Sequence, residues 1–183
     1  AALGYRQDGN QAEDGGLTDP ISGKTIPVHY QVNDADGTPL LQVLASLSDG
    51  METGVLEDLA ENDSDDGGIS YEDYARMLFA DFNEPARWIL IMGLHQIALI
   101  DRRKWNDKKC MLFDLDEIFS RHQDHVYAAM AVLLRRDSLC PDDGGSLLDS
   151  FDDKSAKNAV EVSDSLRSAL RECVEILGNE VIH

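Results

Sequence analysis

The feature that most constrains the fold is a nearly continuous apolar run in the middle of the chain. Residues 88–92 read Trp-Ile-Leu-Ile-Met, and residues 97–100 read Ile-Ala-Leu-Ile after a turn centred on Gly93. A strand buried on both faces of a sheet is apolar throughout, so these two segments predict a central β-hairpin. Residues 110–113 form a third β-rich segment, and together the three predict an antiparallel meander.

A second hairpin is predicted nearer the N-terminus. Residues 28–32 and 40–47 are β-rich, and the pair Asp36-Gly37 lies between them. Asp-Gly between two apolar runs is a hairpin signal, because glycine tolerates the positive φ that the turn requires. We therefore predict a mixed α/β (α+β) domain over residues 1–183, with a central sheet of about five strands and flanking helices.

Helix signals occupy the rest of the chain. Ser70 and Asp73 form a capping box that predicts a helix ending near Asp81. We predict a short helix through Phe119 that is capped by Asp114 or Asp116, and a second helix over residues 124–136. Residues 1–27 are predicted to form a short helix end or turn and then a loop, and residues 141–149 are a predicted loop. The longest periodic segment, residues 155–177, should end at Gly178, and its apolar face comprises Val160, Val162, Leu166, Leu170, Val174 and Leu177.

Charge limits the range of functions. The formal net charge is −19, and an acidic surface repels the phosphates of nucleic acid, so a free-standing DNA-binding domain is disfavoured. Residues 49–66 hold eight acidic residues and no basic one. We expect the segment 49–68 to be a solvated acidic loop that buries little, with one helical turn around residues 55–60.

The catalytic motifs of DNA-modifying enzymes are largely missing from the sequence. Methyl transfer to a base requires a glycine-rich cofactor loop and a motif such as Asn-Pro-Pro-Tyr, and neither occurs. Metal-dependent cleavage uses an acid-x-Lys pattern. Asp107-Lys108-Lys109 resembles it, and we interpret that segment as a solvated turn. An alternative nuclease site would combine Asp34, Asp36 and Gln42, although Leu44 occupies the position of the lysine.

Other metal patterns are weak. The segment 34–37 resembles the opening of a calcium loop but fits a hairpin turn better. His122 and His125 could share a helix face, but two ligands without a third are weak evidence for a metal, so we interpret them as polar residues at a helix start. The three cysteines are far apart and odd in number, as in a cytoplasmic protein with reduced and mostly buried thiols. We therefore predict no catalytic, cofactor-binding or metal residue in this chain.

One basic cluster remains, and it holds seven of the sixteen lysine and arginine residues together with a tryptophan. The favoured interpretation is a soluble edge beside a tight turn. The alternative is a contact for nucleic acid or a partner protein. The cluster consists of Arg102, Arg103, Lys104, Trp105, Lys108, Lys109, Arg135 and Arg136.

Several short segments resemble the N-terminal region of large bacterial adenine-specific DNA methyltransferases from restriction-modification and phage-defence systems. The resembling segments are residues 3–5, 87–90, 99–102 with Trp105, 113–119, 133–139, 157–159 and 175–180. In that family the methylase core lies downstream, so no catalytic residue of the family transfers to this chain. Some relatives carry a nuclease at the front, which suggests a restriction-endonuclease-like fold that here lacks its active site.

The resemblance implies a role inside a larger enzyme. The chain begins Ala-Ala-Leu rather than with Met, and we expect it to be a non-catalytic N-terminal domain whose long helix leads into the methylase. The implied partners are the downstream methylase domain, DNA through the full-length protein, and other defence-system subunits, with no membrane. S-adenosylmethionine is expected for the full-length protein only. The alternatives are a metal-dependent nuclease domain and an independent acidic interaction module such as a DNA mimic.

Overall fold

The computed structural model describes residues 3–5, 17–18, 25–46, 54–58, 69–80, 85–142 and 144–181. The chain divides into two compact units, Ala1–Gly144 and Gly145–His183, and each is described by itself.

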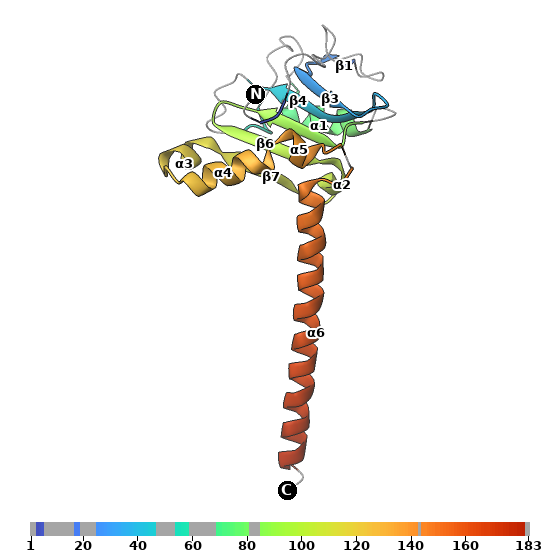
Figure 1. Cartoon of the computed structure of the whole chain (residues 1–183), viewed down its shortest axis with the longest axis vertical. Helices are drawn as coiled ribbons and strands as arrows, with labels where there is room; N and C mark the ends of the chain where they lie inside the picture. The colour runs from blue at the N-terminus through green and yellow to red at the C-terminus, as the bar shows by residue number, and fades with distance from the viewer. Residues whose placement is uncertain are drawn as a thin grey trace. The chain divides into compact units, whose positions relative to one another are not determined.

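The first unit is built on a mixed five-stranded sheet (Figure 1). Its strands lie side by side in chain order and are antiparallel to their neighbours, except that β4 and β5 are parallel. They are β3 (Tyr30–Asn33), β4 (Pro39–Ala45), β5 (Trp88–Met92), β6 (Gln96–Asp101) and β7 (Cys110–Asp114). The predicted α+β class, with about five strands in a mixed sheet, is confirmed.

Both predicted hairpins are present. In the first, the Asp34 carboxylate accepts hydrogen bonds from the amides of Asp36 and Thr38, and Gly37 has the expected positive φ of 89°. In the second, β5 and β6 pair from Trp88↔Asp101 to Met92↔Ile97, and β7 completes the meander. Gly93 permits the close turn, because a Cβ there would lie 2.8 Å from Cγ2 of Val55.

One face of the sheet carries the largest apolar cluster. Helix α1 (Tyr71–Ala80) packs there through Tyr71, Tyr74 and Leu78, against sheet residues that include Ile91 and Ile100. Its capping box is formed as predicted: the Ser70 hydroxyl accepts from the Asp73 amide at 3.1 Å and donates to the Asp73 carboxylate at 2.9 Å.

The acidic segment is only partly described, at residues 54–58. Its predicted helical turn is present, since the amides of Glu57 and Asp58 donate to the carbonyl of Gly54. The expectation that it buries little is wrong here. Val55 is 3% exposed and belongs to the core, and Asp58 is buried because its carboxylate accepts from the Ser46 hydroxyl.

Other predicted boundaries also need correction. The segment predicted as a charged turn after β6 begins with α2 (Arg102–Trp105). Helix α3 (Leu115–Ser120) is capped by Asp114, as one of the two predictions had it. The helix predicted over residues 124–136 ends earlier, so that α4 (Asp124–Leu133) and α5 (Arg136–Leu139) are separate. Part of the predicted N-terminal loop pairs as two short antiparallel strands, β1 (Leu17–Thr18) and β2 (Thr25–Ile26).

The second unit consists chiefly of one helix, α6 (Leu147–Val181), with 35 residues (Figure 1). It begins eight residues before the predicted start because Ser146 and Asp149 form a second capping box, with the same 3.1 Å and 2.9 Å bonds as in α1. It also continues through Gly178, where an end was predicted. No helix in the described part of the chain is both long and apolar enough to cross a membrane.

Candidate functional site: a basic turn beside an open groove

The basic turn, residues 102–109, follows the last residue of the central strand β6. The Asp101 carboxylate caps α2 by accepting from the Arg103 amide at 3.0 Å. The chain then turns back toward β7 through Lys108, whose φ of 55° is unusual for a residue with a side chain. The Lys108 amide donates to the carbonyl of Trp105 at 2.8 Å, which closes the turn.

A buried ion pair fixes the start of this turn. The guanidinium of Arg87 lies 3.2 Å from the Asp101 carboxylate, and their side chains are only 15% and 8% exposed. Arg87 also lies over the ring of Trp88, 4.5 Å from its centroid, and its carbonyl accepts from the Arg102 amide. Removing one partner of such a buried pair leaves an uncompensated charge, so this clamp holds the basic turn in one position.

The cations of the turn point largely to solvent. Arg102, Arg103, Lys108 and Lys109 are exposed, and Lys104 is half-buried. Lys109 pairs with Asp107 at 3.6 Å, but both side chains are about two-thirds exposed, so that pair contributes little. The segment Asp107-Lys108-Lys109, which resembles the acid-x-Lys pattern, is therefore an exposed turn, as predicted from the sequence. The turn places five cationic residues and one acid within eight positions of a chain whose net charge is −19.

Trp105 connects the turn to the core and to a groove. Its ring packs edge-on against Phe79 of α1, with centroids 6.0 Å apart, and it contacts the core cluster. Beside it an open groove of about 670 Å³ runs between α1 and the start of β7. The groove is lined by Leu56, Glu72, Arg76, Phe79, Ala80, Trp105, Asn106, Lys108 and Cys110.

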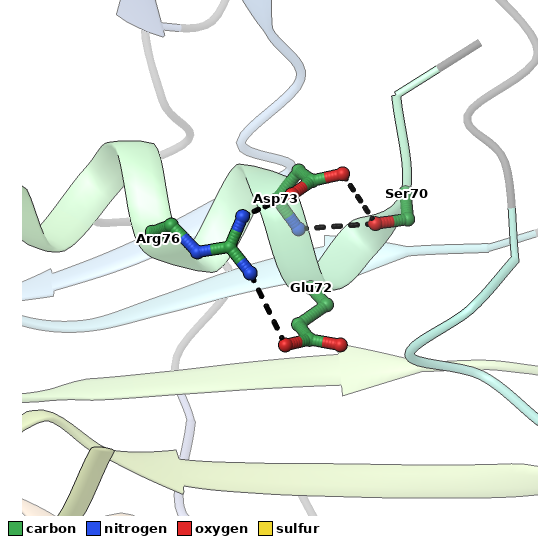
Figure 2. A network of polar contacts seen from close by, with 4 residues as sticks. All are labelled: Ser70, Glu72, Asp73 and Arg76. Carbon is green, nitrogen blue, oxygen red and sulfur yellow. Dashed lines mark hydrogen bonds and ion pairs between the residues drawn. The ribbon is translucent and has the colours of Figure 1, made fainter. Parts of the chain in front are cut away.

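On the α1 wall of the groove, two carboxylates neutralise the positive charge of Arg76. Figure 2 shows Arg76 bound to the carboxylates of Glu72 and Asp73, with Ser70 at the helix start. At the opposite wall, partial burial and then the nearby Glu72 raise the pKa of the Cys110 thiol. Lys108 is thus the cation that distinguishes this groove, since it forms no ion pair with any other residue that the structure describes.

Arg135 and Arg136 belong to a different environment. Arg135 pairs with Asp137 at 3.2 Å, and Arg136 pairs with Asp142 at 2.9 Å. The hydrogen bond to Asp142 raises the pKa of Arg136. Their charges are thus balanced locally by acids around α5, so we separate them from the basic turn.

The alternative nuclease residues are not brought together. Asp34 is occupied in its own turn, whereas Gln42 is buried in β4 and donates to Gln31 at 3.1 Å. Thr38, which closes the Asp34 turn, lies four residues before Gln42, or about 13 Å along a strand. This geometry does not form a shared metal site for Asp34, Asp36 and Gln42.

The alternative metal arrangement of His122 and His125 is not formed, and both lie near the start of α4, as the favoured interpretation had it. His122 lies in a turn with φ 47° and contacts the carbonyl of Ser120, whereas His125 lies in α4, so the two do not share a helix face. Within the part of the chain that the structure describes, no group of three metal-ligating side chains comes together. Cys140 is buried as expected, whereas Cys110 is exposed.

The sequence analysis missed the α1 side of the groove. Glu72, Arg76 and Ala80 are spaced by four, so their position on one helix face could have been recognised. Their proximity to Trp105 and Lys108 is a long-range contact without a local signal.

Comparison with known proteins finds no similar protein. No protein-family model matches the chain, and no curated protein or solved structure matches it at a significant level.

Proposed function

We propose that this chain is a non-catalytic N-terminal domain of an adenine-specific DNA methyltransferase from a restriction-modification or phage-defence system. In this proposal it acts in the cytoplasm as a scaffold that positions DNA or a partner for the methylase, and S-adenosylmethionine binds elsewhere in the full-length protein.

The observation that carries the proposal is the position of the segments that resemble that family. Arg87 and Trp88 come from one segment and Asp101 from another, and they build the clamp beneath the basic turn. Trp105, also among the resembling residues, anchors the other end of α2 against Phe79. The resembling residues therefore support the turn that carries the exposed cations.

Two further hydrogen bonds join four more of the resembling residues. The Tyr5 hydroxyl donates to the carbonyl of Leu134 at 2.9 Å, and the Arg136 amide donates to the carbonyl of Leu3 at 3.0 Å. Gly4 permits this approach, because its φ is +82°. Residues separated by about 130 positions thus hold one another in place, which is the behaviour of a structural frame and supports a scaffold role.

The order and direction of the strands support a restriction-endonuclease-like fold that lacks its active site. The hairpin β3–β4 is followed by α1 and then by β5, which is parallel to β4. The middle of β4 carries Gln42 and Leu44 where an active enzyme would carry an acid and a lysine.

The methyltransferase assignment is tested by the gene and by its complete product. We expect the reading frame to continue past His183 into a glycine-rich cofactor loop and an Asn-Pro-Pro-Tyr motif. The complete product should transfer labelled methyl groups from S-adenosylmethionine to adenine in duplex DNA. A stop codon within a few residues would contradict the assignment, and the acidic interaction module, motivated by the clustered acids of residues 49–66, would then be the leading function.

The positioning role is tested on the same full-length protein. Arg102→Glu combined with Lys108→Glu should weaken DNA binding and reduce the slope of log K against log salt by roughly 1.8, because each lost phosphate contact removes about 0.9. The matched control reverses Arg121 and Arg135, which pair with Glu117 and Asp137, and should leave the slope unchanged. If the two variants changed the salt slope equally, the change in slope would be explained by net charge alone.

A further inference from the structure

Strand β7 forms one edge of the five-stranded sheet. Among the described residues it pairs with β6 alone, and all five of its residues keep a regular register. The opposite edge differs, because β3 carries a bulge between Val32 and Asn33. Bulges, and lysines within a strand, hinder the addition of another strand to an edge. All of β7 is described and it has neither protection, since Lys108 and Lys109 precede its first residue.

The alternation of hydrogen bonds shows which backbone groups of β7 face the open edge. The Leu115 amide donates to the carbonyl of His95 at 2.8 Å, directly after the last paired residues of β6 and β7. Bonded and non-bonded pairs alternate along an antiparallel ladder, so the amides and carbonyls of Phe113 and Met111 also point to β6. Those of Leu112, between them, point away from β6. A further strand therefore finds a donor and an acceptor at Leu112.

The same part of β7 exposes apolar surface. Leu112 lies opposite Ala98, and Cys110 lies opposite Ile100. Opposed residues share one face of a sheet, and Ala98 and Ile100 belong to the core cluster that packs against α1. The β7 residues on this face remain uncovered, because Leu112 is 53% exposed and Cys110 is also exposed. The edge thus combines outward backbone groups with an exposed leucine.

We propose that this edge binds a second copy of this chain, with the two β7 strands antiparallel about a two-fold axis at Leu112. The two sheets then join into one continuous sheet. In this register Leu112 lies opposite Leu112 of the partner subunit, and the outward amide of each donates to the carbonyl of the other. Cys110 lies opposite Asp114 of the partner subunit. Isologous two-fold pairing is also the commonest form of self-association in soluble proteins.

Charge complementarity favours a second copy as the occupant. Residues 102–117 hold five basic and four acidic residues in a chain whose net charge is −19, so two copies repel each other little at this edge. The charges are also ordered along the strand. Lys108 and Lys109 precede β7, whereas Asp114 ends it and Asp116 follows. Antiparallel pairing brings the basic start of each strand to the acidic end of the other.

Two of these charges lie on the same face of the sheet. Lys108 lines the groove together with Cys110, and Asp114 shares the face of Leu112 because it is two residues further along the strand. Lys108 is then a diagonal neighbour of Asp114 of the partner subunit, at roughly 7–8 Å, which a lysine side chain can span. Oδ1 of Asp114 accepts from the Glu117 amide, so Oδ2 can accept from this lysine.

A parallel arrangement of the two strands satisfies the charges less well. In the same register it would place Lys108 beside Lys108 of the partner subunit, and Asp114 beside Asp114 of the partner subunit. Like charges that face each other across two strands are destabilising. The order of charges along β7 therefore selects the antiparallel orientation.

The first test is the mass of the purified 183-residue chain, measured by light scattering over a range of concentrations. We expect twice the monomer mass of 20.2 kDa. Leu112→Lys places two like charges at the axis and should return the chain to 20.2 kDa. Leu170→Lys, the same exchange at a leucine of α6 that is 65% exposed, should leave the dimer intact. A monomer at every concentration, a dimer that survives Leu112→Lys, or a monomer produced by Leu170→Lys overturns the proposal.

The second test locates the interface by hydrogen exchange of single amides. In the dimer the Leu112 amide should exchange at least tenfold more slowly than in the dilute monomer, because it gains an acceptor in the partner subunit. The amides of Met111 and Phe113 are internal controls, since they point to β6 and should be protected at both concentrations. A dimer in which the Leu112 amide exchanges as fast as in the monomer overturns the proposal.

The third test fixes the orientation. Lys108→Asp should weaken the dimer by about tenfold, because it places a like charge beside Asp114 of the partner subunit. Asp114→Asn removes that repulsion and retains a residue that caps helices equally well. The double variant should therefore dimerise more tightly than Lys108→Asp alone. A double variant no tighter than Lys108→Asp excludes the antiparallel register and overturns the proposal.

Discussion

The sheet and α6 contain the same kinds of apolar residues with opposite exposure. Ile89, Ile91 and Ile100 have no exposed surface, whereas Leu166 and Leu170 in α6 are 60% and 65% exposed. The sheet finds its partners within the chain, through α1 and the neighbouring strands. Apolar periodicity therefore identifies the face that must be covered but does not identify the molecule that covers it.

The largest expected effect compares truncations in the two regions. Ile91→Ala should lower the free energy of unfolding of the sheet unit by about 2–5 kcal/mol, because it leaves a cavity in a closed core. Leu166→Ala should leave the urea midpoint of that unit within error, because Leu166 is exposed and lies outside the sheet unit. Tryptophan fluorescence reports the sheet unit, since Trp88 is buried and Trp105 is half-buried. A comparable loss from Leu166→Ala would show that the two regions unfold as one.

A smaller effect concerns pH and only the sheet unit. Burial raises the pKa of the Cys140 thiol to about 11, against the opposing influence of Arg136 and Arg87. The folded pKa lies above the ordinary value of 9.0, so the folded state binds more protons than the unfolded state between these values. The stabilisation is complete below pH 9 and should decline by roughly 2 kcal/mol as the pH approaches 11.

Urea unfolding under reducing conditions at pH 8 and pH 10.5 measures this decline. Cys140→Ala removes the contribution of the thiol and should flatten the pH dependence. Burial also raises the pKa of Tyr5, so part of the decline should remain in the variant. A slope identical to that of the parent chain would contradict the assignment to Cys140.

The smallest effect uses the two capping boxes, which have the same geometry. Ser70→Ala should lower the free energy of unfolding by about 1 kcal/mol, because the Asp73 amide loses its acceptor in a helix that belongs to the core. Ser146→Ala removes the same bond from α6 and should reduce helical circular dichroism without moving the fluorescence transition. If Ser146→Ala also shifted the fluorescence transition, α6 and the sheet unit would not differ in how their caps affect stability.

Much of the fold was predictable from local signals. The Asp36-Gly37 turn, the apolar meander and the Ser70 cap each specify a local conformation, and each is present. The start of α6 was missed, although Ser146 and Asp149 repeat the pattern of Ser70 and Asp73, because the glycines and acids before them resemble a loop. The burial of Val55 was not predictable, since it depends on a distant turn at Gly93.

The candidate site was less predictable than the fold. The basic segment was recognised from its composition, but composition grouped Arg135 with Arg102. Ion pairs with Asp137 and Asp142 separate them, and such pairing is decided by tertiary structure. The clamp between Arg87 and Asp101 joins residues fourteen positions apart, and only the register of β5 and β6 brings them together.

The single parallel pairing, between β4 and β5, has a consequence for how the chain folds. The meander β5–β7 closes through short connections and can form early, whereas β4 must find β5 across the 42 residues that separate Ala45 from Trp88. Long closures cost entropy before any contact offsets it, and non-local pairings slow folding. The acidic segment lies within that closure and repels itself, so salt that screens its charges should speed the step that joins the N-terminal hairpin to the finished meander.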